Sequence, residues 1–377
     1  MPGTKTIVSV YGFEPFRIGG GETFIRELSI LLGQRGWKNV VCFLSEPTPQ
    51  VREFLSLPNV TIEVIPNVWQ LKWQPTRDLA RILRRYRPEI LHLQFTGFVS
   101  PYPWLARLYS VKRVLFTDQA SKPEGFLPRR ASLFKRIATR IINWPLDRVT
   151  CISDYVLRCW ITLDVLQSER FTRIYNHVDF TRCQPDGSAF RKTLSIPDSR
   201  QIIVQVSWMI PDKGFDDLLA AARLVIARNP EAYFVMVGEG ADRQRYIRET
   251  AELGLQDHIA WTGILPDPLK MGVFSAADVV CQVSRWEEGF GYVIAEAMAS
   301  GKPLVGTRVG AIPELVHHGE TGFLVDRRDP SAIAERILEL LADRDLRCRM
   351  GRAGREFAFR NFDANVNIAE FLNLYGI

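Results

Sequence analysis

Short apolar runs alternate with longer amphipathic segments through the first half of the chain. Between residues 24 and 32 the apolar side chains recur at i, i+4, i+7 and i+8, which predicts a helix with one buried face. A second helix is predicted at 76–87 and ends before Pro88, because proline lacks a backbone N–H. The apolar runs predict strands at residues 6–10, 40–44, 61–65, 90–93, 114–117 and 149–152.

The second half repeats this alternation after a turn-rich crossover at residues 175–187. A helix is predicted from about Phe215, and a last helix at about 366–375. The apolar runs predict strands at residues 201–206, 233–237, 259–261, 279–283 and 303–306. Strands that alternate with helices are typical of α/β folds with parallel sheets. The sequence therefore predicts two doubly wound, Rossmann-like α/β domains, at 1–180 and 185–358.

The length and the cysteine pattern agree with this organisation. A chain of 377 residues is long for one core and suits two domains of middling size. No run of 18 apolar residues predicts a membrane-spanning helix, and the first residues do not resemble a secretory signal. The six cysteines are scattered without a Cys-x-x-Cys pair, which favours reduced thiols over a disulfide framework or a zinc site. A cytoplasmic protein is expected.

Positive charge is concentrated in the first half. Residues 1–180 hold 25 Lys and Arg against 15 Asp and Glu, whereas residues 181–377 hold 23 against 27. A basic half favours an anionic acceptor or a membrane surface as a partner. The segment 129–140 interleaves basic residues with Leu133, Phe134 and Ile137, which is compatible with an interfacial helix; a solvated helix face is the alternative. No nucleic-acid-binding motif accompanies the charge, so nucleic acid is not expected as a partner.

The densest chemistry lies in the segment 285–324. Glu288 precedes a Gly-Phe-Gly turn, and Glu296 follows on a predicted helix. Gly289 and Gly291 let the backbone approach a ligand closely, and the N–H groups that open the helix favour a phosphate. Two ionised carboxylates accept hydrogen bonds from sugar hydroxyls. This pattern indicates a site for an anionic ligand that is rich in hydroxyl groups.

The same segment resembles the signature of the retaining nucleotide-sugar glycosyltransferases of the family 4 type. Each part of that signature is present, as Glu288, Gly289-Phe290-Gly291, Glu296-Ala297-Met298-Ala299 and Gly301-Lys302-Pro303. The resemblance extends over nearly the whole chain. It implies a GT-B fold, in which the two domains face each other across a cleft and a C-terminal helix at about 360–377 returns to the first domain. It further implies that the first domain binds the acceptor and the second binds the nucleotide-sugar.

The resemblance also implies roles for single residues. Glu288 contacts the donor sugar, Glu296 contacts the ribose, and the Gly289, Phe290 and Gly291 turn belongs to the donor site. The alternative is a core helix in which Met298 packs and Glu296 is solvated.

Two earlier segments match the family as well. Lys213 lies at the family's Lys-Gly position and would neutralise the diphosphate leaving group, with a plain surface lysine as the alternative. Gly20 and Gly21, in a predicted loop after the first strand, would lie against the donor phosphates or the acceptor. An ordinary turn is the alternative for this loop.

Three positions depart from the family pattern. Trp208 stands five residues before Lys213, where the family usually has Arg, and it either stacks on a ring or packs. Gln119 replaces a frequent His and cannot act as a base, which the resemblance allows because the donor phosphate is thought to take the acceptor proton. His177 replaces the Gly of an Asn-Gly-Val-Asp hinge, so a different loop is expected there.

Two further residues are candidates for the acceptor side. Asp118 would orient the acceptor hydroxyl or cap the next turn. His92 would contact the acceptor, together with Gln119, or lie in the core. His317-His318 and Asp343-Arg344-Asp345 are set aside as metal ligands, so neither a metal nor another cofactor is expected.

The sequence thus predicts a retaining, metal-independent glycosyltransferase. It would move a sugar from a nucleotide-diphosphate sugar (UDP-sugar first, GDP-mannose next) to a hydroxyl of a glycan, lipid-linked or cell-envelope acceptor. It would be cytoplasmic or peripheral on the inner face of the membrane. The alternatives are a nucleotide-sugar epimerase or hydrolase of the same architecture, and a catalytically silent sugar-nucleotide-binding partner.

Overall fold

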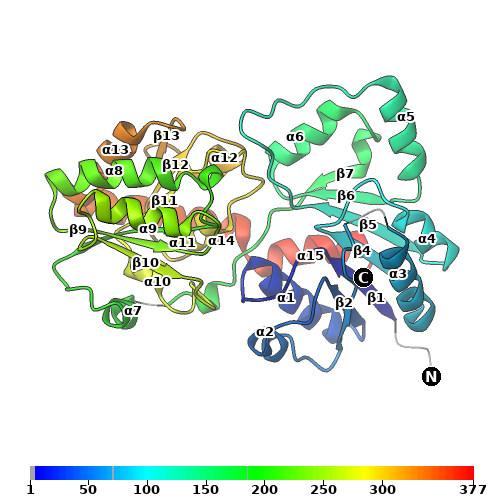
Figure 1. The fold of residues 1–377 in the computed structure, drawn as a ribbon. Coiled ribbons are helices and arrows are strands. Elements are labelled where there is room, and N and C mark those ends of the chain that lie inside the picture. The colour runs from blue at the N-terminus through cyan, green and yellow to red at the C-terminus, as the bar shows by residue number, and fades with distance from the viewer. Residues whose placement is uncertain (1–4, 70–71, 185) are drawn as a thin grey trace. The chain divides into compact units, whose positions relative to one another are not determined.

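A computed structural model describes residues 5–69, 72–184 and 186–377 (Figure 1). The chain divides into two compact units. The first unit comprises residues up to 120, 127–176 and 364–377, and the second comprises 121–126 and 177–363. The sequence division differs from this in three places. It leaves residues 121–126 in the first domain, it extends the first domain to residue 180 instead of 176, and it ends the second domain at residue 358 instead of 363. Residue 185, where the sequence begins the second domain, lies outside the described residues.

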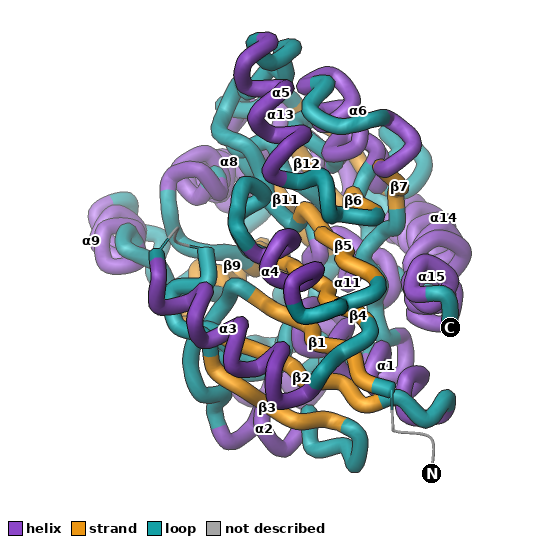
Figure 2. Tube along the Cα trace, turned by 90° about the vertical axis from the view of Figure 1, so that its right-hand side faces the viewer, coloured by secondary structure: helices purple, strands orange, loops and turns teal. Residues whose placement is uncertain are grey.

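Within the described residues the first unit holds a seven-stranded parallel sheet, whose strands are orange in Figure 2. The strand order is β3-β2-β1-β4-β5-β6-β7, and every neighbouring pair is parallel. The strands are β1 (Thr6–Tyr11), β2 (Lys38–Phe43), β3 (Val60–Val64), β4 (Ile90–Gln94), β5 (Arg113–Asp118), β6 (Arg148–Cys151) and β7 (Phe171–Arg173). All six residues of β1 are buried, as expected for a parallel strand that is covered on both faces.

Helices follow these strands and cover the sheet. They are α1 (Gly20–Gln34), α2 (Pro49–Phe54), α3 (Trp73–Tyr86), α4 (Tyr102–Leu108), α5 (Leu133–Ile142) and α6 (Asp154–Leu163), with a 3-10 turn at Ser168–Arg170. The chain returns at its end as α15 (Ala364–Tyr375), red in Figure 1, and packs beside α1, where the rings of Phe24 and Phe371 lie 5.0 Å apart.

A buried histidine ties α15 to the middle of this sheet. His92 on β4 is fully buried, and its Nδ1 lies 2.6 Å from the hydroxyl of Tyr375. Its Nε2 lies 2.6 Å from Oγ1 of Thr117 on β5. Both ring nitrogens are therefore engaged inside the unit. The sequence left two roles open for His92, an acceptor contact or a place in the core. The structure places it in the core, where it offers no polar atom to a ligand.

Replacement of His92 by Gln is expected to reduce the sensitivity of folding to acid. Burial lowers the pKa of His92 from 6.5 to about 3, so the imidazole stays neutral in the folded chain while the unfolded chain takes up a proton below pH 6.5. Stability is therefore lost as the pH falls from 6.5 towards 3. By pH 5 the loss from this residue is about 2 kcal/mol, at about 1.4 kcal/mol per pH unit.

Urea unfolding at about pH 7.5 and pH 5 measures this difference. The variant should lose about 2 kcal/mol less than the wild type between the two conditions. His317→Gln is the control, since the His317 side chain is 41% exposed. An acid response of His92→Gln equal to that of the wild type would contradict the assignment.

Within the described residues the second unit holds a six-stranded parallel sheet of order β10-β9-β8-β11-β12-β13. Its strands are β8 (Gln201–Val206), β9 (Ala232–Val237), β10 (Ile259–Gly263), β11 (Val279–Gln282), β12 (Leu304–Thr307) and β13 (Gly322–Val325). This is the Rossmann order 3-2-1-4-5-6, and the strand order reverses between β8 and β11. Ligands of such sheets bind beyond the carboxyl ends of the strands at that point.

The helices of the second unit range from the four residues of α10 to the 19 residues of α14. They are α7 (Ser188–Thr193), α8 (Phe215–Arg228), α9 (Arg243–Glu252), α10 (Val273–Ala276), α11 (Tyr292–Ala299), α12 (Ile312–Leu315), α13 (Pro330–Ala342) and α14 (Arg344–Phe362), with 3-10 turns at Phe180–Arg182 and Pro211–Lys213. Asp343, which the sequence set aside as a metal ligand, caps α14: its Oδ1 accepts the N–H of Leu346 at 2.8 Å.

The predicted α/β class is confirmed, with two Rossmann-like units. Strand β8 has the bounds that the sequence predicts, and α8 begins at Phe215 as expected. The short strands β7 and β13 were not predicted. Helix α1 begins at Gly20, so Gly20 and Gly21 lie in its first turn and not in the predicted loop. No helix in the described part of the chain is both long and apolar enough to cross a membrane.

Candidate functional site

A lysine and a glutamate meet at the switch point of the second sheet. Lys213 follows β8 in the 3-10 turn Pro211–Lys213, and Glu288 lies in the loop after β11. The Lys213 Nζ atom is 2.7 Å from Oε1 of Glu288. Only 15% of the Lys213 side chain and 8% of the Glu288 side chain are exposed. The sequence predicted both as catalytic residues, and the structure brings them into one ion pair.

Two further side chains engage the Glu288 carboxylate. Gln282 Nε2 donates to Oε1 at 3.3 Å, and Ser121 Oγ donates to Oε2 at 3.2 Å. Ser121 Oγ also accepts the N–H of Gly289 at 3.2 Å. Both carboxylate oxygens therefore have partners that fix their direction. Sequence reasoning missed Ser121, because nothing in the chain marks a serine 167 residues before Glu288 as its neighbour.

Glycines open the two helices that start at this point. Gly214 precedes α8 with φ +72°, and a Cβ there would lie 1.8 Å from the carbonyl oxygen of Val283. Gly291 precedes α11 with φ +99°. Residues with side chains rarely adopt such φ values, so both turns require glycine. The N–H groups at a helix N-terminus favour an anion, and here both helices begin next to the loops that carry Lys213 and Glu288.

The residue before Glu288 fixes the loop itself. Glu287 is buried, and its Oε1 accepts Arg327 Nη2 at 2.9 Å and the N–H of Gly125 at 3.2 Å. Its Oε2 accepts the N–H of Gly310 at 2.7 Å. The loop after β11 is thereby held to the loops after β12 and β13. Sequence reasoning missed this anchor, although the adjacent pair Glu287-Glu288 was a visible signal.

A second ion pair holds the start of the same loop. Arg285 donates to both carboxylate oxygens of Asp217 on α8, at 2.8 and 2.6 Å. The Asp217 carboxylate raises the pKa of Arg285 above its ordinary value by accepting these hydrogen bonds. A bidentate pair of this kind fixes orientation as well as distance. The segment between Arg285 and Gly291 is thus preorganised by its neighbours.

The remaining predicted donor residues have different environments. Phe290 is 2% exposed, and its ring makes edge-on contacts with Tyr292 at 5.6 Å and Phe362 at 5.3 Å. The Phe290 ring therefore packs in the core, and the predicted donor contact of this residue would be made by its backbone. Glu296 is half-buried on α11, and Trp208 is 48% exposed between β8 and Lys213.

Two of the residues predicted for the acceptor side lie at the end of β5 in the first unit, Asp118 as its last residue and Gln119 directly after it. Asp118 Oδ1 accepts the N–H of Ala120 at 3.0 Å, and its Oδ2 accepts Trp160 Nε1 at 2.8 Å. The structure thus places Asp118 in the turn-capping role that the sequence left open beside acceptor orientation. Gln119 pairs with Asn176 through two amide hydrogen bonds, of 3.1 and 3.0 Å.

Two glycines and one histidine complete the predicted set. Gly20 and Gly21 open α1, where the Glu22 carboxylate accepts the N–H of Gly19 at 3.0 Å. Their place at a helix N-terminus after β1 is compatible with an anion. His177 is buried and does not adopt a positive φ, in agreement with the different loop expected there. Burial lowers its pKa from 6.5 to about 4.

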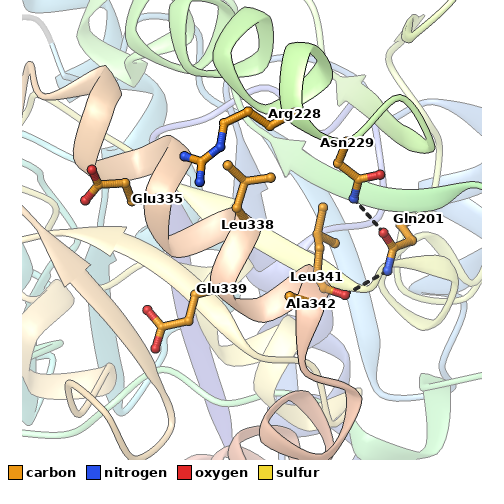
Figure 3. Close-up of a pocket in the computed structure, with 8 residues that line it drawn as sticks. All are labelled: Gln201, Arg228, Asn229, Glu335, Leu338, Glu339, Leu341 and Ala342. Carbon is orange, nitrogen blue, oxygen red and sulfur yellow. Dashed lines mark hydrogen bonds between the residues drawn. The ribbon is translucent and has the colours of Figure 1, made fainter.

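A separate pocket lies at the opposite end of the second sheet (Figure 3). Gln201, the first residue of β8, lies on its wall and accepts Asn229 Nδ2 at 2.8 Å. The other lining residues are Arg228, Glu335, Leu338, Glu339, Leu341 and Ala342. None of the predicted site residues lines this pocket, so it is distinct from the candidate site. Among the described residues, no group of three or more His, Cys, Asp or Glu is placed to hold a metal ion.

Comparisons with known proteins give two family matches that together span most of the chain. Residues 186–357 match the model "Glycosyl transferases group 1", and residues 18–182 match "Glycosyltransferase Family 4".

The chain is also similar to individual proteins of these families. The chain is 30% identical over 296 residues to a GDP-mannose-dependent alpha-(1-6)-phosphatidylinositol monomannoside mannosyltransferase of Mycobacterium tuberculosis, covering 75% of each chain. It is 26% identical over 370 residues to the N-acetyl-alpha-D-glucosaminyl L-malate synthase of Bacillus anthracis, covering 95% of this chain and 94% of that protein. The fold is similar to that of HepE of Anabaena, solved in complex with UDP, with a TM-score of 0.78, 20% identity and 99% of each chain covered.

Proposed function

This chain belongs to the family 4 glycosyltransferases of group 1, and we propose that it transfers a sugar from a nucleotide-diphosphate sugar to an acceptor hydroxyl with retention of configuration. The observation that carries the proposal is the ion pair of Lys213 and Glu288 at the switch point of the second sheet. A fixed cation and a fixed acceptor group thus lie where this fold binds its ligands.

In the proposed reaction the bond between the sugar C1 and the diphosphate oxygen breaks. A new bond forms between C1 and the acceptor oxygen on the same face of the ring. The acceptor proton passes to an oxygen of the leaving diphosphate, since the amide of Gln119 does not titrate. Lys213 stabilises the charge that develops on the diphosphate, and its position is set in advance by Glu288.

The surrounding residues would hold the rest of the donor. The Glu288 carboxylate accepts from a sugar hydroxyl, and Glu296 accepts from the ribose. The backbone of Gly289 and Gly291 approaches the phosphates at the start of α11. Trp208, half-exposed and five residues before Lys213, is suited to stack on a ring of the donor. Gly20 and Gly21 remain candidates for a second phosphate contact.

The donor is proposed to be a UDP-sugar first and GDP-mannose next. UDP-sugars are frequent donors in the family, and a relative that is named as GDP-mannose-dependent supports the second choice. The acceptor is proposed to be a glycan, a lipid-linked or a cell-envelope hydroxyl, reached from the cytoplasmic side of an anionic membrane. The proposal requires no metal and no other cofactor.

Two other functions remain as alternatives. A nucleotide-sugar epimerase or hydrolase of the same architecture would act on the donor without an acceptor. A catalytically silent binding partner is suggested by Trp208 and Gln119, which stand where the family has Arg and His. Transfer is favoured because the chain retains Lys213, Glu288 and Glu296 together, and a silent partner has no physical need of all three.

Release of nucleotide diphosphate from a panel of nucleotide-sugars tests the proposal. Turnover of one donor that is lost in Glu288→Ala is the expected result. Glu320→Ala is the matched control, because the Glu320 side chain is 71% exposed. An epimerised donor or release unaffected by Glu288→Ala would support the alternatives. Binding of a donor without turnover, even with glycan and lipid acceptors added, would favour the silent partner.

A further inference from the structure

Helix α5 of the first unit presents an apolar stripe to solvent. Five large apolar side chains recur along it at spacings of three, four and seven residues, which places them on one face. Their exposed fractions are 68% for Leu133, 83% for Phe134, 49% for Ile137, 60% for Ile141 and 67% for Trp144 just beyond the helix. The helix lies at the periphery of the unit in both views (Figures 1 and 2).

The side of α5 that faces the protein is polar. Thr139 is the buried residue within the helix, and the adjoining Asn143 is fully buried. A surface helix ordinarily turns its apolar stripe to the core and its polar side to water. Helix α5 is oriented the other way, so most of its apolar stripe lies outside the core of the described unit.

Helix α4 extends the same surface. Trp104 Nε1 donates to the carbonyl of Ile141 at 3.1 Å, which fixes α4 beside α5. Trp104 is 49% exposed, and Leu108, one turn further along α4, is 78% exposed. We call Trp104, Leu108, Leu133, Phe134, Ile137, Ile141 and Trp144 the α4–α5 face. An exposed apolar surface of this extent marks an interaction site.

Cations surround this face. Residues 125–146 contain five Lys and Arg and no Asp or Glu. The guanidinium groups of Arg130, Arg136 and Arg140 converge on the single carboxylate of Asp164. One negative charge faces three positive charges, so the cluster keeps a positive excess. Arg130 and Arg140 are 67% and 44% exposed, and Lys135 is exposed as well.

We propose that the α4–α5 face docks on an anionic lipid bilayer. Apolar side chains that enter the acyl region, tryptophans at its margin and cations at headgroup level are the features by which amphipathic helices lie in a membrane interface. A second copy of the chain fits less well, because a two-fold contact through this face would place the same cation-rich, acid-free segments against each other. This inference extends the proposed function. It rests on that function in one respect, namely that the acceptor is reached at a membrane.

Vesicle flotation of the full chain tests the proposal without requiring sugar transfer. Vesicles of phosphatidylcholine with about 30% phosphatidylglycerol are compared with pure phosphatidylcholine. The wild type is expected to float with the anionic vesicles. Phe134→Ser combined with Ile137→Ser is expected to weaken binding at least about tenfold, by removing two large apolar groups. Phe359→Ser is the matched control, since Phe359 is 60% exposed on α14 of the second unit.

A second pair of measurements keeps the proposal testable if the double variant folds poorly. Lys135→Gln should weaken binding to anionic vesicles, and quenching of tryptophan emission by brominated lipid should fall in Trp144→Phe. Equal binding of wild type and variants, no flotation at all, or a dimer in solution that Phe134→Ser dissociates would overturn the proposal. Flotation by a chain that releases no nucleotide diphosphate would uphold docking while the transferase proposal fails.

Discussion

Replacement of Lys213 by alanine is expected to lower kcat for sugar transfer about 100- to 1,000-fold, the loss typical when a preorganised group that stabilises developing charge is removed. The Nζ of Lys213 lies 2.7 Å from Glu288 Oε1 and is little exposed, so the cation is held in place before reaction. Charge on the diphosphate is largest as the bond to C1 breaks. The lysine therefore acts mainly on the transition state and should affect kcat more than KM.

Steady-state kinetics with the donor identified by the panel measures this effect. Lys192→Ala removes an exposed lysine on α7 of the same unit and should leave both constants unchanged. Lys213→Arg keeps the positive charge but replaces the compact ammonium group by a planar guanidinium group, so partial activity is expected. A rise in KM with kcat unaltered would show that Lys213 only binds the donor and would contradict the assigned role.

The fold was largely predictable because its signals are local. Apolar runs such as β8 are buried on both faces and stand out from the amphipathic helices between them. Strand β7 is only three residues long, and β13 begins at a glycine, which is unusual within a strand, so pairing with β6 and β12 defines them instead. The start of α1 was misplaced because glycines favour loops, whereas the capping contact of Glu22 with Gly19 opens the helix.

The candidate site was predictable only as far as its residues form motifs. Lys213 and Glu288 lie in recognisable segments, and their contact follows once β8 and β11 are neighbours. Phe290 stands between two glycines and suggested a ligand contact, but its ring packs on Phe362 of α14, far along the chain. Ser121 carries no motif at all. Long-range neighbours of this kind are set by topology, which a single segment does not encode.

The ion pair between Lys213 and Glu288 is also expected to support the second unit. Removing one partner leaves the other charge buried without its counter-ion. The loss of one member of a buried ion pair typically destabilises the folded protein by about 3 kcal/mol or more. Lys213→Met and Glu288→Gln should therefore each lower the free energy of unfolding by about that amount. The double variant leaves no isolated charge, so its loss should be smaller than the sum of the two by about 1–3 kcal/mol.

Urea unfolding of the four proteins gives this coupling energy. The exposed pair Arg336 and Glu339, with side chains 39% and 43% exposed, provides a control cycle in which the coupling should stay below about 0.5 kcal/mol. Additive losses at Lys213 and Glu288 would mean that each charge is satisfied by other groups, such as Gln282 for the carboxylate. A large coupling would mean that the loops after β8 and β11 are joined mainly through this pair. The cation proposed to act on the diphosphate would then also maintain the shape of its own site.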